Sequence, residues 1–419
     1  MYQHALLIIG LSLLLAACQS TRSPGTAAVP TTTPATTTAA DMTASSTPDA
    51  SAAPTTAPLT VDGPTLLPTE DPPPGGNQFT TDFSRHSVPY HEILAGGPPK
   101  DGIPAIDQPR FVSVAEADAW LEPQEPVILL QIGTATRAYP LQILTWHEIV
   151  NDTLDGMPVV VTFCPLCNTA IAFDRRVSDQ VLDFGTTGLL RYSNLIMYDR
   201  QNESWWQQAT GEAIAGRDTG SQLTFLPASI VAWAEFKANY PESTVLSRET
   251  GMTRNYGRNP YPGYDDVNQP PFLYQGPLTP GTLPATARVL TVDLDDEAMA
   301  YPYELLSTVG AINDTVGGNE IVVFWQAGTA SALDATTVAG GRDVGTAAAF
   351  SRLVDGRVLT FERADERLVD METDSTWDVL GRAVDGPLEG TQLLPVVAVN
   401  HLWFSWAAFN PDTRIFEKK

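Results

Sequence analysis

Residues 137–163 read RAYPLQILTWHEIVNDTLDGMPVVVTF, and residues 299–325 read MAYPYELLSTVGAINDTVGGNEIVVFW. The two stretches align without a gap at an offset of 162 residues, sharing Tyr-Pro, Asn-Asp-Thr, a turn glycine and a Val-Val pair. Self-similarity at a fixed offset is the signature of a structural repeat, so the sequence predicts two copies of one unit. The predicted parts are an N-terminal arm (77–124), a first repeat lobe (125–250), a Tyr/Gly/Pro-rich connecting loop (251–286) and a second, degenerate repeat lobe (287–419).

The predicted fold class is α+β, strand-rich, with two tandem pseudo-equivalent lobes that arose by internal duplication. PVVVTF at 158–163 is a short β-branched run that predicts a buried strand, and NTAIAFDR at 168–175 predicts the next one. PASIVAWAEFKANY at 227–240 has apolar positions at helical spacing and predicts a helix that ends the first copy. NHLWFSWAAF at 400–409 predicts the final helix of the second copy, with His401 as a packing residue.

The N-terminal region has the features of an export signal followed by a tether. Residues 1–17 form an apolar run too short to span a membrane and predict a signal peptide. They end in Leu15-Ala16-Ala17-Cys18, which resembles a bacterial lipobox and implies lipidation of Cys18, although the run opens without Lys or Arg. Residues 18–76 are rich in Thr, Pro and Ala and have too little to bury to offset an ordering entropy of roughly 1–2 kcal/mol per residue. We therefore expect an exported protein on a lipidated, disordered stalk, anchored to the outside of the cytoplasmic membrane or to the outer membrane.

The charge of the chain limits its partners. It carries 24 Lys and Arg against 49 Asp and Glu, a formal net charge of −25. No basic patch stands out, which argues against nucleic acid as a partner. The predicted partners are the membrane, through the lipid on Cys18, and an unidentified protein or small molecule, and we expect the folded body to be monomeric.

Besides the predicted lipidation site Cys18, the chain has two cysteines, in the stretch VTFCPLCNT at 161–169. Pro165 presets a turn between Cys164 and Cys167, and Asn168 tolerates a left-handed backbone after the second cysteine. The arrangement is similar to a rubredoxin-type or zinc knuckle. It differs from a thioredoxin-type pair, because no helical period follows Cys167. A disulfide across so short a loop would stabilise the fold by roughly 2 kcal/mol or less, so the spacing favours a functional pair over a structural bridge.

Comparison of the two copies suggests that the cysteines act together with neighbouring residues. The reactive residues of the first copy and their counterparts are His147 and Val309, Glu148 and Gly310, Cys164 and Gln326, and Cys167 and Thr329. Because these residue types disappear together, we predict one functional unit in the first copy. Two thiolates with His147, and with Met197 as a softer ligand that the alignment sets opposite Asp370, would suit copper or zinc as the cofactor. Glu148 would orient His147.

Three functions remain open on these residues. The first is a Cys-Cys-His centre that binds a soft or borderline metal for metal handling or electron transfer. The second is a thiol-disulfide oxidoreductase that uses the Cys164/Cys167 pair with His147 as acid/base. The third is a non-catalytic cell-surface module, in which Trp205-Trp206 and the Tyr-rich loop at 254–266 contact a ligand such as a glycan. Whether the protein is an enzyme is left undecided by the sequence.

Several motifs resemble a bacterial and archaeal family catalogued as domain of unknown function 3179. They are GGPPKDGIPAIDQPRFV (96–112), TWHEIVND (145–152), TFCPLCNTAIAFDR (162–175), SNLIMYDRQNESWWQQATGEAIAG (193–216) and NPYPGYDD (259–266). The family usually has Gly where this chain has Asn168, and either residue suits the same turn. The resemblance implies domain limits and carries no established activity.

Overall fold

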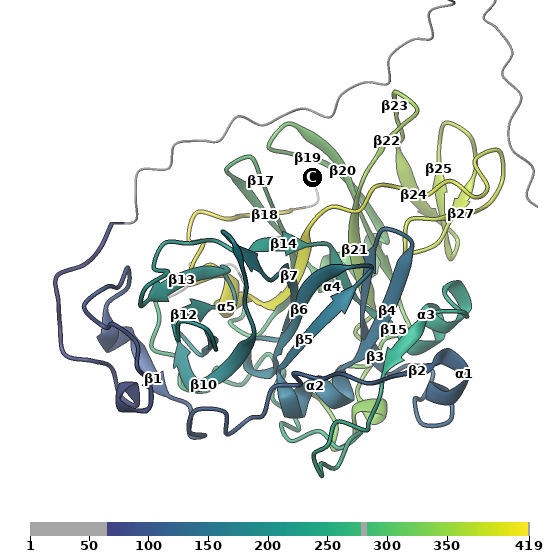
Figure 1. The fold of residues 1–419 in the computed structure, drawn as a ribbon. Helices are drawn as coiled ribbons and strands as arrows, with labels where there is room; N and C mark the ends of the chain where they lie inside the picture. Colours follow the sequence, from purple (N-terminus) through teal and green to yellow (C-terminus); the bar gives the residue numbers. More distant parts are fainter. Residues whose placement is uncertain (1–64, 278–282, 418–419) are drawn as a thin grey trace, which may run out of the picture. The chain divides into compact units, whose positions relative to one another are not determined.

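The cysteine-bearing strand lies inside a four-stranded sheet of the computed structural model, which describes residues 65–277 and 283–417 (Figure 1). In spatial order the strands are β14 (Thr224–Leu226), β7 (Thr169–Asp174), β6 (Met157–Cys164) and β5 (Ile149–Leu154). Both strands predicted around the cysteines are confirmed. Side chains alternate along β6, so Val161 and Phe163 enter one core while Val160 and Cys164 enter another on the opposite face.

Two five-stranded sheets and three helices accompany this sheet in the first half of the chain, which here means the described residues before the connecting loop (251–286). One sheet has the order β15 (Ala228–Ala232), β3 (Pro126–Ile132), β4 (Ala135–Pro140), β16 (Thr244–Leu246), β2 (Phe111–Ser113). The other has the order β1 (Ile93–Ala95), β10 (Phe184–Arg191), β11 (Asn194–Asp199), β12 (Trp205–Gln207), β13 (Glu212–Ala215). The remaining elements are the β8 (Arg176–Val177) and β9 (Gln180–Val181) hairpin and helices α1 (Val114–Ala117), α2 (Leu141–His147) and α3 (Trp233–Asn239).

The second half, the described residues after the connecting loop, contains three sheets of three or four strands and one hairpin. The first has the order β28 (Ala398–Leu402), β17 (Arg288–Leu294), β18 (Glu297–Pro302), β29 (Arg414–Ile415). The second is β19 (Ala311–Val316), β20 (Asn319–Gln326), β21 (Thr346–Ser351), and the third is β24 (Phe361–Ala364), β25 (Arg367–Asp370), β26 (Thr376–Trp377), β27 (Ala383–Asp385). The other elements are the β22 (Leu353–Val354) and β23 (Arg357–Val358) hairpin and helices α4 (Tyr303–Val309) and α5 (Trp403–Ala407). The described chain is therefore a strand-rich α+β protein.

The same side-chain hydrogen bond occurs at matching places in the two halves. In the first, the Tyr139 hydroxyl on β4 donates to the Asp152 carboxylate on β5 at 2.6 Å. In the second, the Tyr301 hydroxyl on β18 donates to Asp314 on β19 at 2.8 Å. Each bond joins the strand before a short helix to the strand after it, so it fixes the course of the chain around α2 and α4.

A second matching bond corrects the alignment around Met197. The Trp206 indole donates to Asp199 at 2.9 Å, and the Trp377 indole donates to Asp370 at 2.9 Å. Asp370 therefore occupies the position of Asp199. Met197 pairs with Trp206 across the strands as Leu368 pairs with Trp377, so the predicted pairing of Met197 with Asp370 is wrong by two residues.

The two predicted terminal helices are shorter than expected. In the stretch 227–240, residues Ala228–Ala232 form strand β15, and only Trp233–Asn239 are helical. In the stretch 400–409, His401 lies on strand β28, and the helix begins at Trp403. In both places the first residues pair with the edge of a neighbouring strand, β3 or β17, and these ladder hydrogen bonds override the helical spacing of the apolar residues.

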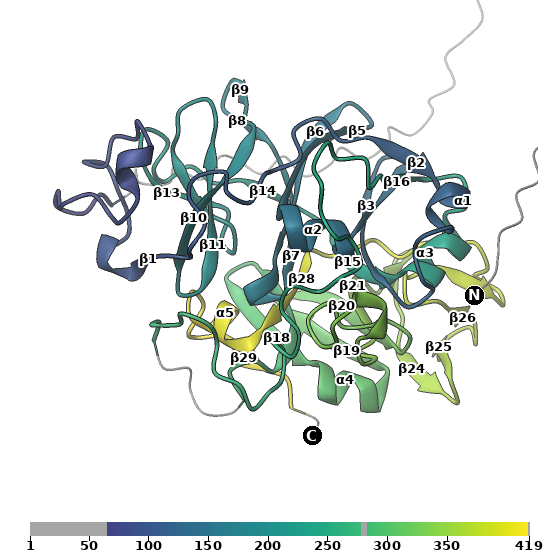
Figure 2. The ribbon, with the colours of Figure 1, turned by 90° about the horizontal axis from the view of Figure 1, so that it is seen from below.

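The two halves share one hydrophobic core. Strand β15 of the first half lies beside β21 of the second (Figure 2). Val127 and Phe236 of the first half belong to the same buried cluster as Phe324 and Trp377 of the second. The halves therefore stabilise each other rather than standing as separate lobes.

The signal peptide, Cys18 and most of the predicted stalk lie outside the described residues. Ordered contacts begin before the predicted stalk boundary at residue 76, because the Leu67 amide donates to the His86 carbonyl at 2.9 Å and the Tyr90 amide donates to Glu70 at 2.8 Å. Among the described residues, none of the helices has the length and apolar character needed to cross a membrane.

Candidate functional site

The turn that carries the two cysteines has the predicted geometry. Cys164 ends β6, a single 3-10 turn covers Pro165–Cys167, and β7 starts at Thr169. Asn168 has φ 51° and ψ 38°, which is the left-handed region expected for this position. The strands hold the ends of the turn together, so both sulfur atoms are kept on the same short stretch of rigid backbone.

Both cysteines are free thiols inside the protein. Cys164 is 2% exposed and Cys167 is fully buried. The Cys167 thiol donates to the Ser193 carbonyl at 3.5 Å, and it also interacts with the Cys164 side chain. Burial raises the pKa of Cys167 well above its usual value, and the neighbouring Cys164 raises it further. Cys167 is therefore held as a protonated thiol that lies close enough to Cys164 to interact.

His147 is engaged elsewhere. It is the last residue of α2 and is fully buried, with Nδ1 2.7 Å from the Pro104 carbonyl and Nε2 2.6 Å from the Tyr256 hydroxyl. Desolvation lowers the pKa of His147 and keeps the ring neutral. Because both ring nitrogens already have partners, this imidazole needs to break a hydrogen bond before it can serve the cysteines.

The other predicted metal ligand packs in the same cluster as the cysteines. Met197 lies on β11, is fully buried, and belongs to the same hydrophobic cluster as Cys164 and Cys167. Within the part of the chain that the structure describes, however, His, Cys, Asp and Glu side chains form no group of three or more that is arranged to hold a metal ion.

Glu148 has an unusual backbone. It follows α2 with φ 59° and ψ −31°, a conformation that side-chain-bearing residues rarely adopt. Its amide donates to the Leu144 carbonyl at 2.7 Å and its carbonyl accepts from the Phe163 amide at 2.8 Å, so the backbone is fixed on both sides. The matching residue of the second half is Gly310, with φ 76° and ψ −38°. A conformation suited to glycine thus carries a glutamate here, and strain of this kind is concentrated at functional sites.

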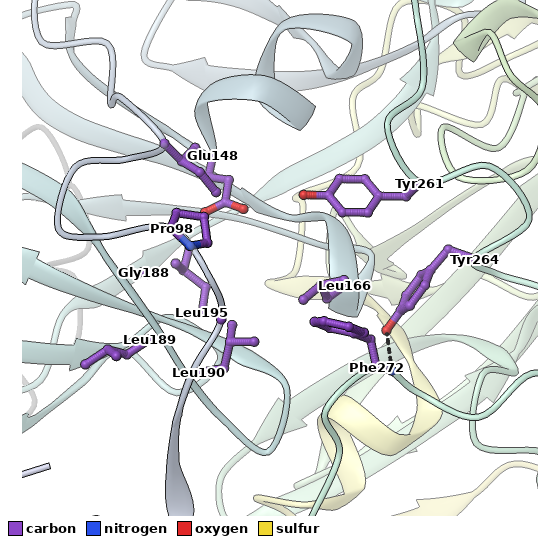
Figure 3. A pocket seen from close by; sticks show the side chains of 12 residues that line it. Pro98, Glu148, Leu166, Gly188, Leu189, Leu190, Leu195, Tyr261, Tyr264 and Phe272 are labelled. Carbon is purple, nitrogen blue, oxygen red and sulfur yellow. Dashed lines mark hydrogen bonds between the residues drawn. The ribbon is translucent and has the colours of Figure 1, made fainter. Parts of the chain in front are cut away.

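The Glu148 side chain points into a cavity of about 290 Å³ (Figure 3). Leu166, which separates the two cysteines, forms part of the wall together with Leu190, Leu195, Tyr261, Tyr264 and Phe272. Glu148 is 8% exposed, and burial raises the pKa of its carboxyl to about 8. None of the described residues donates a hydrogen bond to this carboxyl, and neither Lys nor Arg is among those that line the cavity. At neutral pH the group is therefore an uncharged carboxylic acid in apolar surroundings.

A different histidine reaches the cysteine turn from the second half of the chain. His401 on β28 is fully buried, and its Nδ1 lies 2.9 Å from the Thr169 hydroxyl. That hydroxyl donates to the Cys167 carbonyl at 3.2 Å, and Thr169 faces Cys164 across β6 and β7. Burial lowers the pKa of His401 to about 3, so the ring is neutral, and among the described residues its Nε2 has no hydrogen-bond partner.

A family model described as a protein of unknown function, DUF3179, matches residues 100–413. The chain belongs to this family. The match begins within the predicted N-terminal arm and extends past β28, and it includes the cysteine turn, Glu148, both tyrosines of the cavity and His401. No curated protein and no solved structure matches the chain.

In this DUF3179 protein the connecting loop forms part of the site. Tyr256 contacts His147, while Tyr261 and Tyr264 line the cavity. Trp205 and Trp206 are fully buried, so they do not present the ligand-contacting surface proposed for a glycan-binding module. The contribution of His401 was missed because it lies 232 residues from Thr169 in sequence and no local pattern links the two.

Proposed function

We propose that the protein is an exported thiol-disulfide oxidoreductase in which Cys164 and Cys167 alternate between a dithiol and a disulfide. The observation that carries the proposal is the pair of free, interacting thiols on one rigid turn, beside a cavity that holds an unpaired carboxyl. A pair used only for structure would be expected as a closed bridge in an exported protein. The carboxyl of Glu148, without a hydrogen-bond partner and on a strained backbone, does not stabilise the folded state, which favours a functional role for this residue.

The two sulfur atoms have different environments, and this difference assigns their roles. Cys164 retains slight exposure, whereas Cys167 is fully buried and has a raised pKa. Cys164 therefore attacks a sulfur atom of a small disulfide, forming a mixed disulfide and releasing one thiol. Cys167 then attacks Cys164, which forms the intramolecular disulfide and releases the second thiol. The two cysteine protons end on the two released thiols, so the exchange balances without another reactant.

Glu148 is a candidate to move the proton in the first step. It is close enough to Cys167 to influence its pKa, and its own pKa of about 8 suits proton exchange near neutral pH. This role replaces the acid/base function predicted for His147, whose nitrogens are both hydrogen-bonded.

The test is a redox titration of the full-length protein in buffers of reduced and oxidised glutathione, followed by alkylation of free thiols and mass analysis. We expect reversible loss of two thiols in one two-electron step. Cys164→Ser and Cys167→Ser should each abolish that step. A bridge that resists reduction, or thiols that stay reduced in every buffer, would contradict the proposal.

A metal centre is the second candidate. The groups that surround the cysteines are acids, namely Glu148, Tyr261 and Tyr264, and desolvation raises the pKa of each. A bound cation would favour their ionised forms, and Met197 offers a soft ligand in the same cluster. Elemental analysis of protein purified without reductant separates the candidates, because stoichiometric copper or zinc that is lost in Cys164→Ser supports the metal centre.

We also infer that the two halves arose by internal duplication. The matching Tyr-to-Asp and Trp-to-Asp hydrogen bonds, and the shared backbone of Glu148 and Gly310, support this origin. The export signal and the lipid on Cys18 remain part of the proposal. Mass spectrometry of the mature N-terminus tests both, since lipidation predicts cleavage before Cys18 and an added acyl mass.

A further inference from the structure

The cavity beside the cysteine turn has two polar groups at one place on an otherwise apolar wall. The Glu148 carboxyl and the Tyr261 hydroxyl point toward one another across it (Figure 3). Tyr264 also faces the cavity, but its hydroxyl already accepts a hydrogen bond from the Phe272 amide at 3.3 Å. The two polar groups that point toward one another are therefore Glu148 and Tyr261, and a ligand atom placed between them would contact both.

The chemistry of these two groups defines the ligand atom. Burial raises the pKa of Tyr261, with the nearby Glu148 adding to the effect, and burial also raises the pKa of Glu148. Both groups therefore carry their protons and act as hydrogen-bond donors at neutral pH. A tyrosine hydroxyl and a protonated carboxyl in an apolar site form a pair that accommodates a carbonyl oxygen.

The remainder of the wall defines the body of the ligand. Leu166, Leu190 and Leu195 supply aliphatic surface, and Phe272 supplies an aromatic face. No Lys or Arg is present among the described lining residues to neutralise an anion. The volume of about 290 Å³ is at the lower limit of the roughly 300–1,000 Å³ common for ligand pockets, which restricts the occupant to a small molecule.

We propose that this cavity binds a small, uncharged, apolar carbonyl compound of one or two rings, with its oxygen between the Tyr261 hydroxyl and the Glu148 carboxyl. The backbone of Glu148 supports this assignment, because glycine occupies the same conformation in the second half without strain. The Glu148 carboxyl has no hydrogen-bond partner among the described residues, and a ligand carbonyl that accepts its proton supplies one. The binding does not require the cysteines, so it stands apart from the proposed thiol-disulfide exchange.

The test measures binding of 1-tetralone, a neutral bicyclic ketone, to the full-length protein by isothermal titration calorimetry. Tetralin has the same rings without the carbonyl, and 1-naphthoate carries a negative charge. We expect 1-tetralone to bind about three- to tenfold more tightly than tetralin, as one or two hydrogen bonds provide, and 1-naphthoate to bind more weakly than either.

Variants locate the site and keep the proposal open to refutation. Tyr261→Phe should weaken 1-tetralone binding by about three- to tenfold and leave tetralin unchanged. Tyr240→Phe is the control and should change both affinities less than twofold, because it removes a tyrosine hydroxyl that does not line this cavity. Glu148→Leu should remove most of the preference for the ketone, whereas Glu148→Gln, which keeps a donor, should retain it. Circular dichroism and thermal melts confirm that each variant is folded.

Several results would overturn this inference. They are equal affinities for 1-tetralone and tetralin, no binding of either compound, equal effects of Tyr261→Phe and Tyr240→Phe, and tighter binding of 1-aminotetralin, which would assign the cavity to a cation. Cys164→Ser/Cys167→Ser should still bind 1-tetralone. A redox titration that fails while this binding persists would refute the oxidoreductase proposal and leave the ligand site standing.

Discussion

Glu148 shows how one residue can oppose stability in three ways. Its backbone lies in a region that favours glycine, its carboxyl is buried, and none of the described residues donates a hydrogen bond to it. Each feature destabilises the folded state by an amount on the order of 1 kcal/mol or more. Gly310 has the same backbone conformation without any of these costs. The first half of the chain therefore retains a destabilising residue at the cavity, as expected where stability is exchanged for function.

Comparing Glu148→Gly with Glu148→Ala measures the strain. Alanine removes the carboxyl and keeps the strained backbone, whereas glycine removes both. In regular structure Ala is more stable than Gly by about 0.5–1 kcal/mol. Here we expect the reverse, with Glu148→Gly about 1 kcal/mol more stable than Glu148→Ala in urea unfolding. Equal stabilities, or a more stable alanine variant, would show that the backbone is not strained.

The raised pKa of Glu148 also predicts how stability depends on pH. The pKa rises from 4.5 to about 8 on folding, so between these values the unfolded chain loses a proton that the folded protein keeps. The free energy of unfolding then falls as pH rises through this window, by up to about 1.4 kcal/mol per pH unit from this group. Glu148→Gln has no ionisable group at this position. The free energy of unfolding of this variant relative to wild type should therefore rise from pH 5 to pH 8 and level off above. Urea unfolding at pH 5, 6.5 and 8.5 checks this, and parallel pH profiles would contradict it.

The turn between β6 and β7 is the element that gives the cysteines their geometry. Pro165 starts the 3-10 turn, and Asn168 ends it in the left-handed region, where a β-branched residue is strongly disfavoured. The side-chain amide nitrogen of Asn168 is buried and has no hydrogen-bond partner among the described residues. The position is therefore selected for backbone conformation rather than for a side-chain contact.

Substitution of Asn168 tests this reading of the turn. Asn168→Gly should stabilise the protein by up to about 1 kcal/mol, because glycine adopts the left-handed conformation freely and removes an unsatisfied amide. Asn168→Val should destabilise it by about 1–3 kcal/mol and make the thiols of Cys164 and Cys167 react faster with Ellman's reagent. Chemical unfolding and thiol kinetics provide the two measurements. A valine variant with native stability and native thiol kinetics would contradict the account.

At the scale of the whole molecule, the second half completes the site of the first. His401 contacts Thr169 beside the cysteines, and Phe324 packs in the same core as Val127. Because one hydrophobic core spans both halves, the described body should unfold as one cooperative unit.

Removal of core volume from the second half should therefore expose the cysteines of the first. Phe324→Ala should lower the free energy of unfolding by about 3–5 kcal/mol. The midpoint of thiol exposure in urea should shift together with the midpoint measured by circular dichroism. Leu353→Ala, in an exposed hairpin residue, is the control and should leave both midpoints within error. Thiol exposure that stays at the wild-type midpoint in Phe324→Ala would show that the halves unfold independently.

The sequence by itself determined the strands around the cysteines, the left-handed turn at Asn168 and the strand-rich α+β class. These features are local, since alternation of apolar residues and the backbone preferences of Pro and Asn act within a few residues. Only the tertiary structure decided that His147 hydrogen-bonds to Tyr256, that His401 reaches the cysteine turn, and that Glu148 faces Tyr261 in a cavity. Those neighbours come from strands and loops far apart in the chain. Their meeting depends on how the sheets of the two halves pack, which no local pattern of residues encodes.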